Sequence, residues 1–177
     1  MPDSGVAGVV LAAGEATRFG GPKQALLLPH VLRRAAEAGL DDLVVVLGAH
    51  EVAVEGARVV RCADWSQGPG ASLAAGLAAL GQEVEAAVVC LADGPLLSPE
   101  AIRRVVSAWQ EGAGDVVAAS YEGVRGHPVC LGRSAWERVP AAGGRDLPAV
   151  LVPCDDLGAP DDVDTPADLR RVERLLD

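Results

Sequence analysis

The segment VVLAAGEATRFGGPKQALL, from Val9 to Leu27, places two cations on a glycine-rich stretch directly after an apolar run. Glycines allow backbone N–H groups to approach a phosphate closely. Lys23 can offer phosphate oxygens a compact charge, and Arg18 can offer them a planar fork of donors. The alternative is an ordinary turn with two solvated cations. Because the spacing matches neither the Walker A loop nor the G-x-G-x-x-G fingerprint, the segment alone predicts either a turn or an anion-binding loop.

Two aspartates could complete such a site. Asp93 comes directly after the apolar run Ala86–Ala92, where a carboxylate is costly unless it has a partner. Mg²⁺ is a natural partner, because it binds carboxylates together with water and substrate phosphates. Asp164, in the segment DDVDTPADL, could reach the same pocket and complete a metal–phosphate site. The alternatives are that Asp93 caps a tight turn and that Asp164 is a solvated acid stabilising a helix N-terminus.

Two other segments carry candidate contacts. The segment WSQGPGASLAAGL leads through a Gly-Pro-Gly turn into an expected helix near Ser72, whose N-terminus could face a nucleotide base or phosphate. The alternative is a core helix in which Gly76 allows close packing. His127 precedes Pro128, which restricts its backbone to extended conformations. This histidine could contact a substrate or act as a base, or it could be purely structural.

Apolar runs that alternate with helix-like segments indicate how these residues are positioned. We expect strands at Val6–Ala13, Leu43–Leu47, Arg58–Cys62, Ala86–Ala92 and Asp115–Ser120, and an antiparallel strand around Pro128–Leu131. We expect helices at Val31–Ala38, Ser72–Leu80 and Pro99–Gln110, and a last helix that runs from the Thr165 cap to the C-terminus. Continuous apolar strands are typical of a parallel sheet that is covered by helices on both faces. Ligands of such sheets bind outside the carboxyl ends of the strands.

Composition narrows the class of protein. The chain has 177 residues, half of them hydrophobic, which favours one domain with a sizeable core. A net charge of −10 argues against an extended nucleic-acid interface. No apolar stretch is long enough for a membrane span, and no basic segment precedes the first apolar run, so we expect neither a membrane helix nor a secretory signal. Four widely spaced cysteines are interpreted as core residues of a cytoplasmic protein, not as a zinc site.

Taken in order, these segments resemble the MobA-like nucleotidyltransferase family, and within it the molybdenum cofactor cytidylyltransferase branch. The resembling pieces span nearly the whole chain. They are Leu11-Ala12-Ala13-Gly14, Arg18-Phe19-Gly20 with Lys23, Trp65 with Gly68-Pro69-Gly70-Ala71-Ser72-Leu73 and Gly76, Ala92-Asp93-Gly94-Pro95, Gly126-His127-Pro128, and Asp162-Val163-Asp164-Thr165-Pro166. Each piece is weak by itself, whereas the ordered set is specific.

The resemblance implies a three-layer α/β/α sandwich with a Rossmann-like, mostly parallel sheet, like that of nucleotide-diphospho-sugar transferases, formed by residues 1–177 as one domain. It implies an enzyme that uses Mg²⁺ to transfer a nucleoside monophosphate from a nucleoside triphosphate to an acceptor phosphate, with release of pyrophosphate. CTP is favoured by Ala13, GTP is the other possibility, and the implied acceptor is molybdopterin. The resemblance assigns residues to these parts as follows. The triphosphate would be held by Lys23 and Arg18, and Mg²⁺ by Asp93 and Asp164. The base and phosphate site would be lined by Leu11, Ala12, Ala13 and Gly14, and the nucleotide would be approached by Ser72 and Gly76. The acceptor side would contain Gly126, His127 and Pro128.

The sequence departs from the family pattern after the lysine and in the segment linked to acceptor recognition. The segment Gln24–Pro29 is shorter than usual, and only Gly143-Gly144-Arg145-Asp146 remains of a longer motif. A sugar phosphate or another small phosphate is therefore an alternative acceptor. A non-catalytic nucleotide-binding module that partners a molybdoenzyme maturation factor is the alternative from another class. A dinucleotide-binding oxidoreductase is disfavoured because the glycine spacing is wrong.

Overall fold

The strands form one mostly parallel sheet, as the apolar runs predict. The structure, a computed structural model, describes residues 5–15, 23–160 and 162–176. Within these ranges the sheet has seven strands in the order β3-β2-β1-β4-β6-β5-β7. The strands are β1 (Val6–Ala12), β2 (Leu43–Leu47), β3 (Arg58–Arg61), β4 (Ala86–Leu91), β5 (Val116–Tyr121), β6 (Val124–Gly132) and β7 (Val150–Pro153). β6 pairs antiparallel with β4 and β5, and the other pairings are parallel.

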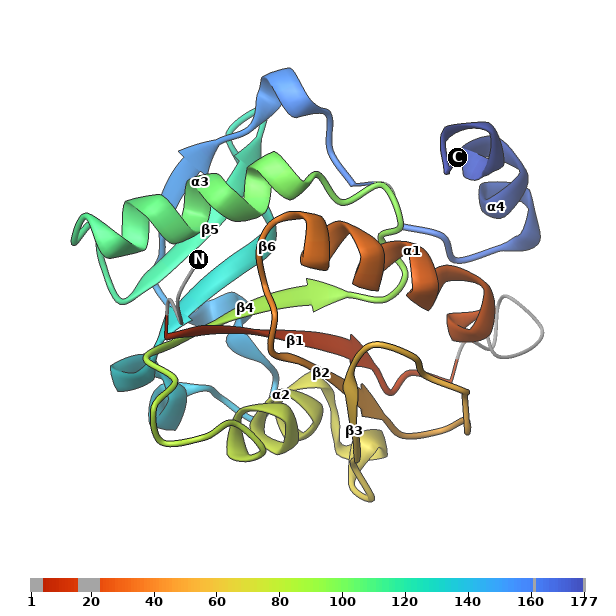
Figure 1. Ribbon diagram of the computed structural model, residues 1–177, viewed down its shortest axis with the longest axis horizontal. Coiled ribbons are helices and arrows are strands. Elements are labelled where there is room, and N and C mark those ends of the chain that lie inside the picture. The colour runs from red at the N-terminus through yellow and green to blue at the C-terminus, as the bar shows by residue number, and fades with distance from the viewer. Residues whose placement is uncertain (1–4, 16–22, 161, 177) are drawn as a thin grey trace.

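Helices cover both faces of the sheet, so the predicted three-layer α/β/α sandwich is confirmed. Helices α1 (Gln24–Glu37) and α3 (Pro99–Gln110) lie on one face, and α2 (Pro69–Ala78) lies on the other (Figure 1). Val9 and Val10 are both fully buried in β1 and point to opposite layers. Val10 packs with Val31 of α1 in one core cluster, whereas Val9 packs with Leu77 of α2 in the other. Burial on both faces explains why the strands read as continuous apolar runs.

The first helix begins earlier than its sequence predicts. The prediction placed it at Val31–Ala38, whereas α1 begins at Gln24 and contains Pro29. Proline in a helix interior removes one backbone hydrogen bond, so a sequence pattern favours a break there. Here the burial of Leu27 and Leu28 against the rest of the chain keeps the first turns helical. The segment that looked like a shortened loop is therefore the start of α1.

The antiparallel strand predicted at Pro128–Leu131 is confirmed and is longer, because β6 spans Val124–Gly132. It follows β5 through a tight turn at Glu122 and Gly123, whose φ angles are +52° and +77°. Positive φ at both central residues is what a two-residue type I′ hairpin requires. β7 was not predicted. It is an apolar but short strand at the edge of the sheet, with Val150 and Leu151 exposed, and it ends in Pro153, so it lacks the long buried run that marks the central strands.

The helix after Thr165 closes the molecule beside α1. Helix α4 (Pro166–Val172) begins with the predicted capping box, in which the Thr165 hydroxyl accepts from the Asp168 N–H and the Asp168 carboxylate accepts from the Thr165 N–H. The α-helix ends at Val172 and a 3₁₀ turn (Glu173–Leu175) follows, so the prediction of a helix to the C-terminus was too long. Val172 and Leu176 pack against Leu27 of α1.

This cap gives a stability prediction. Replacing Thr165 with alanine removes the acceptor for the Asp168 N–H, and we expect a loss of about 1 kcal/mol in the free energy of unfolding. For a chain of this size the loss corresponds to a melting temperature about 2–4 °C lower, measured by calorimetry. Thr165→Ser keeps the hydroxyl and is the matched control. An alanine variant as stable as the serine variant would show that the Thr165 hydroxyl contributes nothing to stability.

Candidate active site

The ammonium group of Lys23 joins three parts of the chain. Lys23 precedes α1, and its side chain is only 10% exposed. Its Nζ donates to the Val163 carbonyl at 2.6 Å, to Asp164 Oδ1 at 3.1 Å and to Asp93 Oδ2 at 3.4 Å. A further bond from the Val163 N–H to the Asp93 carbonyl, 2.8 Å long, ties the end of β4 to the segment before α4. The two carboxylates and the lysine that the sequence singled out therefore lie together.

Lys23 is also the only lysine in the sequence, beside fourteen arginines. Elsewhere arginines make forked ion pairs with carboxylates, such as Arg61 with Glu51 and Arg104 with Asp156. A guanidinium is planar, whereas an ammonium is a compact donor of three hydrogen bonds. The three acceptors around Nζ use that compact geometry, which explains why the chain has lysine at this position.

A cavity of about 500 Å³ opens at the carboxyl ends of β1 and β4, next to Lys23. This is where an open α/β sheet is expected to hold its ligand. The predicted site residues that line it are Leu11, Ala12, Ala13, Gly14, Lys23, Ser72, Asp93 and Asp164. Arg18, predicted to share the triphosphate with Lys23, lies outside the described residues.

Gly76 and His127 are not among the described residues that line this cavity. A Cβ added at Gly76 would lie 2.6 Å from Val9 Cγ1 and 2.9 Å from Val46 Cγ2. Gly76 is thus a point of close helix–sheet packing, which was the alternative raised for it. His127 lies in β6, where its carbonyl accepts from the Tyr121 hydroxyl at 2.9 Å and its peptide bond to Pro128 is cis.

His127 is held in its neutral form. Burial, with the charges of Arg125 and Arg145 adding to it, lowers the pKa of the imidazole from 6.5 to about 4. At neutral pH His127 can therefore serve as a hydrogen-bond donor and acceptor or as a base, but it does not supply a positive charge. The guanidinium groups of Arg125 and Arg145 are the nearby positive charges that could attract an anion.

This environment gives a prediction for pH dependence. We expect the His127 ring protons to titrate near pH 4 in NMR spectra, with the signal assigned by its loss in His127→Gln. The unfolded chain binds this proton near pH 6.5, so stability falls as the pH drops from about 6.5 to about 4, where the unfolded state carries more protons. A midpoint near 6.5 for the His127 signal would show that the imidazole is solvated.

Arg125 holds the segment that sequence analysis linked to the acceptor. Its guanidinium donates to the carbonyls of Gly144 at 3.0 Å, Arg145 at 3.1 Å and Leu147 at 2.5 Å. The preceding loop lies against the start of α2, where the Gly70 N–H donates to the Ala141 carbonyl at 3.2 Å. A Cβ at Gly70 would lie only 2.4 Å from that carbonyl oxygen. The glycine therefore permits a contact that no other residue would allow.

Part of the cavity lining was not predicted from the sequence. Gln24, Ser66 and Leu91 also line it, as does Trp65, which is part of the family pattern. Gln24 is 4% exposed, and its Nε2 donates to the Gly14 carbonyl at 2.9 Å. Gln24 was not predicted to lie at the site, because Pro29 suggested that this segment is a loop and not the start of a helix. A Cβ at Gly48 would lie 2.6 Å from Trp65 Cβ, so Gly48 is what lets the indole approach the sheet.

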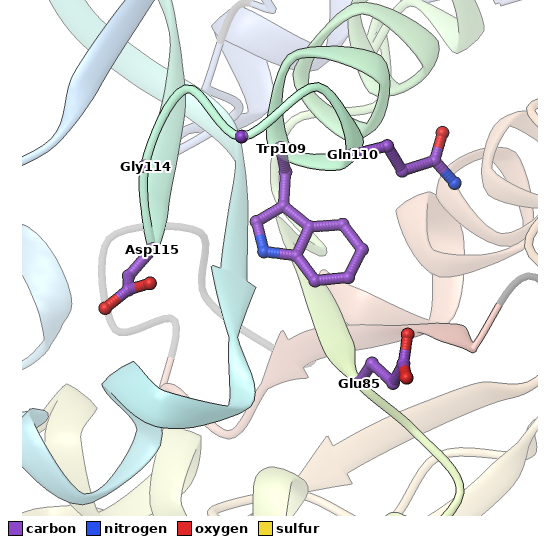
Figure 2. Close-up of a pocket in the computed structure, with 6 residues that line it drawn as sticks. Glu85, Trp109, Gln110, Gly114 and Asp115 are labelled. Carbon is purple, nitrogen blue, oxygen red and sulfur yellow. The ribbon is translucent and has the colours of Figure 1, made fainter.

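Another hollow lies at the amino ends of β4 and β5, at the opposite ends of the strands from Lys23 (Figure 2). Glu85 and Asp115 directly precede β4 and β5, and Trp109 comes from the end of α3. Its volume is about 360 Å³, and its described lining includes none of the predicted site residues. The carboxyl groups of Glu85 and Asp115 flank the indole in the view, and both residues are exposed. It provides positions for control substitutions far from Lys23.

The MobA-like NTP transferase domain matches residues 8–155. The chain belongs to this family. The MobA-like chain is therefore a nucleotidyltransferase, and the matched region contains Lys23, Asp93 and the start of α2, whereas Asp164 lies beyond it. The described helices include none that is both long and apolar enough to cross a membrane.

Individual relatives of the MobA-like chain differ in their names. Nicotine blue oxidoreductase of Paenarthrobacter nicotinovorans is 32% identical over 97% of this chain and 96% of its own length. The crystal structure of Rv0371c from Mycobacterium tuberculosis H37Rv has a TM-score of 0.79 at 29% identity, with 96% and 97% of the two chains covered. Rv0371c in complex with manganese gives 0.75 at 30% identity over 94% and 97%. The 2-C-methyl-D-erythritol 4-phosphate cytidylyltransferase of Thermus thermophilus shares the fold, with a TM-score of 0.67 at 20% identity over 97% and 98%.

Proposed function

We propose that this nucleotidyltransferase transfers CMP from CTP to the phosphate of a molybdopterin-type acceptor and releases pyrophosphate. The observation that carries the proposal is the contact of Lys23 Nζ with both Asp93 and Asp164 beside a cavity at the carboxyl ends of β1 and β4. A cation and two carboxylates at one cavity suit a triphosphate with its metal ion. CTP is preferred to GTP because Ala13 follows the cytidylyl branch in the sequence resemblance.

The donor set fits Mg²⁺. Asp93 and Asp164 offer hard carboxylate oxygens, both residues line the cavity, and their side chains are partly exposed, at 29% and 37%. The described ranges contain no cluster of three or more His, Cys, Asp or Glu side chains arranged for a metal. Mg²⁺ does not need one, because it is usually held by one or two carboxylates plus water and substrate phosphates. When bound, the ion would neutralise charge that develops on the phosphate oxygens. The manganese complex of Rv0371c supports a divalent metal in a relative.

The residues of the chain would act mainly by positioning. In the transfer, the bond between the α-phosphorus and the bridging oxygen to the β-phosphate breaks, and a bond from an acceptor phosphate oxygen to the α-phosphorus forms. Pyrophosphate carries away the electron pair of the broken bond. Such a reaction needs alignment and charge neutralisation more than a protein nucleophile. Lys23, with Arg18, would bind the triphosphate, Leu11 to Gly14 would line the nucleotide site, and Ser72 would meet it from α2.

The acceptor would approach from the side of β6. Arg145 is exposed and its charge acts on His127, so a phosphate group placed there would meet a cation and a neutral imidazole. The hydrogen bonds from Arg125 to the Gly144 and Arg145 carbonyls hold the backbone of this segment in place. The same geometry would accept a sugar phosphate or another small phosphate, which is the alternative acceptor class.

The setting of the enzyme is also a proposal. We place it in the cytoplasm as one domain over residues 1–177, working with a molybdoenzyme maturation factor. All four cysteines are free and buried. Burial raises the pKa of Cys90 to about 12 and that of Cys130 to about 12, so neither thiol would react readily at neutral pH. Inert core thiols suit a reducing compartment.

A ligand panel tests this function. Thermal unfolding would be followed with CTP, GTP, ATP, UTP and NADPH, each with and without Mg²⁺, because a true ligand stabilises the native state by mass action. We expect the largest upward shift in melting temperature with CTP plus Mg²⁺. A shift with NADPH alone would contradict the proposal and favour a chemistry like that in the name of the 32% identical relative. CTP binding with no turnover on any acceptor would favour a non-catalytic module.

A further inference from the structure

The carboxamide of Gln24 has one bonded end and one unbonded end. Gln24 is the first residue of α1, is 4% exposed and lines the cavity beside Lys23. Its Nε2 donates to the carbonyl oxygen of Gly14 at 2.9 Å. Because a carbonyl can only accept, this contact fixes the orientation of the amide, and Oε1 must be the other atom.

Oε1 of Gln24 is buried and has no hydrogen-bond partner among the described residues. An acceptor left unsatisfied in this way costs roughly 1–3 kcal/mol, and native proteins rarely leave one without a reason. The Gly14 contact prevents the amide from turning over to seek another partner. Gln24 lines the cavity that a ligand would fill, so a ligand bound there can supply the missing donor once it reaches this covered atom.

The chemistry of Oε1 restricts what that donor is. An amide oxygen accepts and does not donate, so it cannot bond the oxygens of an ionised triphosphate, which also only accept. Lys23 and the proposed metal already account for the phosphates. The remaining donors on a nucleoside triphosphate are O–H groups of the ribose and N–H groups of the base.

We propose that Gln24 recognises the nucleoside part of the substrate, with Oε1 accepting a hydrogen bond from a ribose hydroxyl or a base amino group. This inference rests on the proposed function, because it assumes a nucleoside triphosphate in the cavity. Nε2 and Gly14 hold the amide in place, so Oε1 is already oriented before the ligand arrives. A site built to bond a substrate donor rejects an analogue that lacks it more strongly than an apolar pocket can.

Calorimetric titration of the full chain with four nucleotides tests the inference. CTP would be compared with UTP, which lacks the 4-amino group, with 2′-deoxy-CTP and with 3′-deoxy-CTP, all with Mg²⁺. We expect the wild-type protein to bind one of the three analogues about tenfold more weakly than CTP, since one lost hydrogen bond near 1.4 kcal/mol is a factor of ten. UTP would identify the base, and the deoxy analogues would identify the ribose. Equal affinity for all four nucleotides would overturn the inference without any variant.

A substitution at Gln24 tests how much its side chain contributes to nucleotide binding. Gln24→Met keeps a similar length and volume but removes both amide atoms, and Gln82→Met makes the same change at an exposed loop position as a control. We expect Gln24→Met to weaken CTP binding about tenfold and to bind the discriminated analogue as well as CTP. Binding of inorganic tripolyphosphate with Mg²⁺, which has no nucleoside, should stay at the wild-type level.

The outcomes separate the two proposals. Wild-type affinity for CTP in Gln24→Met, or an equal loss for tripolyphosphate, would overturn the role of Gln24 and leave the nucleotide site standing. A folded wild-type protein that binds none of the nucleotides would overturn the proposed function and this inference with it. Unchanged melting temperature in Gln24→Met would confirm that any loss of binding is local.

Discussion

Replacing Lys23 with methionine is expected to lower kcat/KM for the nucleoside triphosphate by about 10²–10³-fold. Methionine keeps much of the length of the side chain but removes the ammonium that contacts Asp93, Asp164 and the Val163 carbonyl. Removing one hydrogen-bond donor that stabilises a transition state typically costs about 2.7–4 kcal/mol, which is a factor of this size. Steady-state kinetics with saturating Mg²⁺ would measure it.

Lys23→Arg is the informative companion. It keeps the positive charge but places a planar fork among three acceptors that now surround a compact ammonium. We expect most of the activity loss to remain, because charge alone does not restore the geometry. Arg61→Met, which removes an exposed ion pair to Glu51, is the control and should leave activity unchanged. Wild-type kinetics in Lys23→Met would contradict a phosphate-binding role for this lysine.

The single lysine also allows an independent check. An amine-directed reagent can modify only Lys23 and the N-terminal amine, because the sequence has no other lysine. Nucleoside triphosphate and Mg²⁺ should protect Lys23, but not the N-terminus, from modification, as read by mass spectrometry of peptides. Equal labelling of Lys23 with and without ligand would show that the bound triphosphate does not cover it.

The substitution Asp93→Asn is expected to abolish Mg²⁺-dependent turnover, with a loss of at least about 100-fold. Asparagine preserves the shape of the side chain but removes the charge, so it is a weaker ligand for a hard cation. Activity measured across a range of Mg²⁺ concentrations would separate weakened metal binding from lost catalysis. Asp115→Asn is the matched control. Asp115 lies at the amino end of β5, away from the cavity, and its substitution breaks only a surface ion pair with Arg138. Full activity of Asp93→Asn at every Mg²⁺ concentration would leave Asp93 as a turn cap only.

The sequence predicted the sheet and the meeting of the site residues because both follow from the chain's strongest patterns. Continuous apolar runs such as Leu43–Leu47 are buried on both faces and pair in parallel. Polar residues that follow them, such as Asp93 after β4, must then lie at one edge of the sheet. The cap at Thr165 was equally visible, because a capping box is a local pattern.

Other features depend on contacts that no local pattern encodes. The start of α1 was missed because Pro29 is unfavourable in a helix, and only burial of Leu27 and Leu28 against the rest of the chain outweighs it. The 2.6 Å bond from Lys23 to the Val163 carbonyl joins residues 140 positions apart and involves a backbone atom that every residue carries. The unbonded oxygen of Gln24 could not be foreseen, because it is defined by which partners the fold leaves out.

The most direct test of nucleotidyl transfer at this site follows a radioactive phosphate from CTP into the products. The protein would be incubated with Mg²⁺, molybdopterin and CTP labelled with ³²P at either the α or the γ position, and the products would be separated. The account predicts that the α label appears in the acceptor product and the γ label in pyrophosphate, both lost in Lys23→Met. Release of the γ label as inorganic phosphate, or an α label that stays in CTP while the wild-type protein binds the nucleotide, would contradict nucleotidyl transfer at this site.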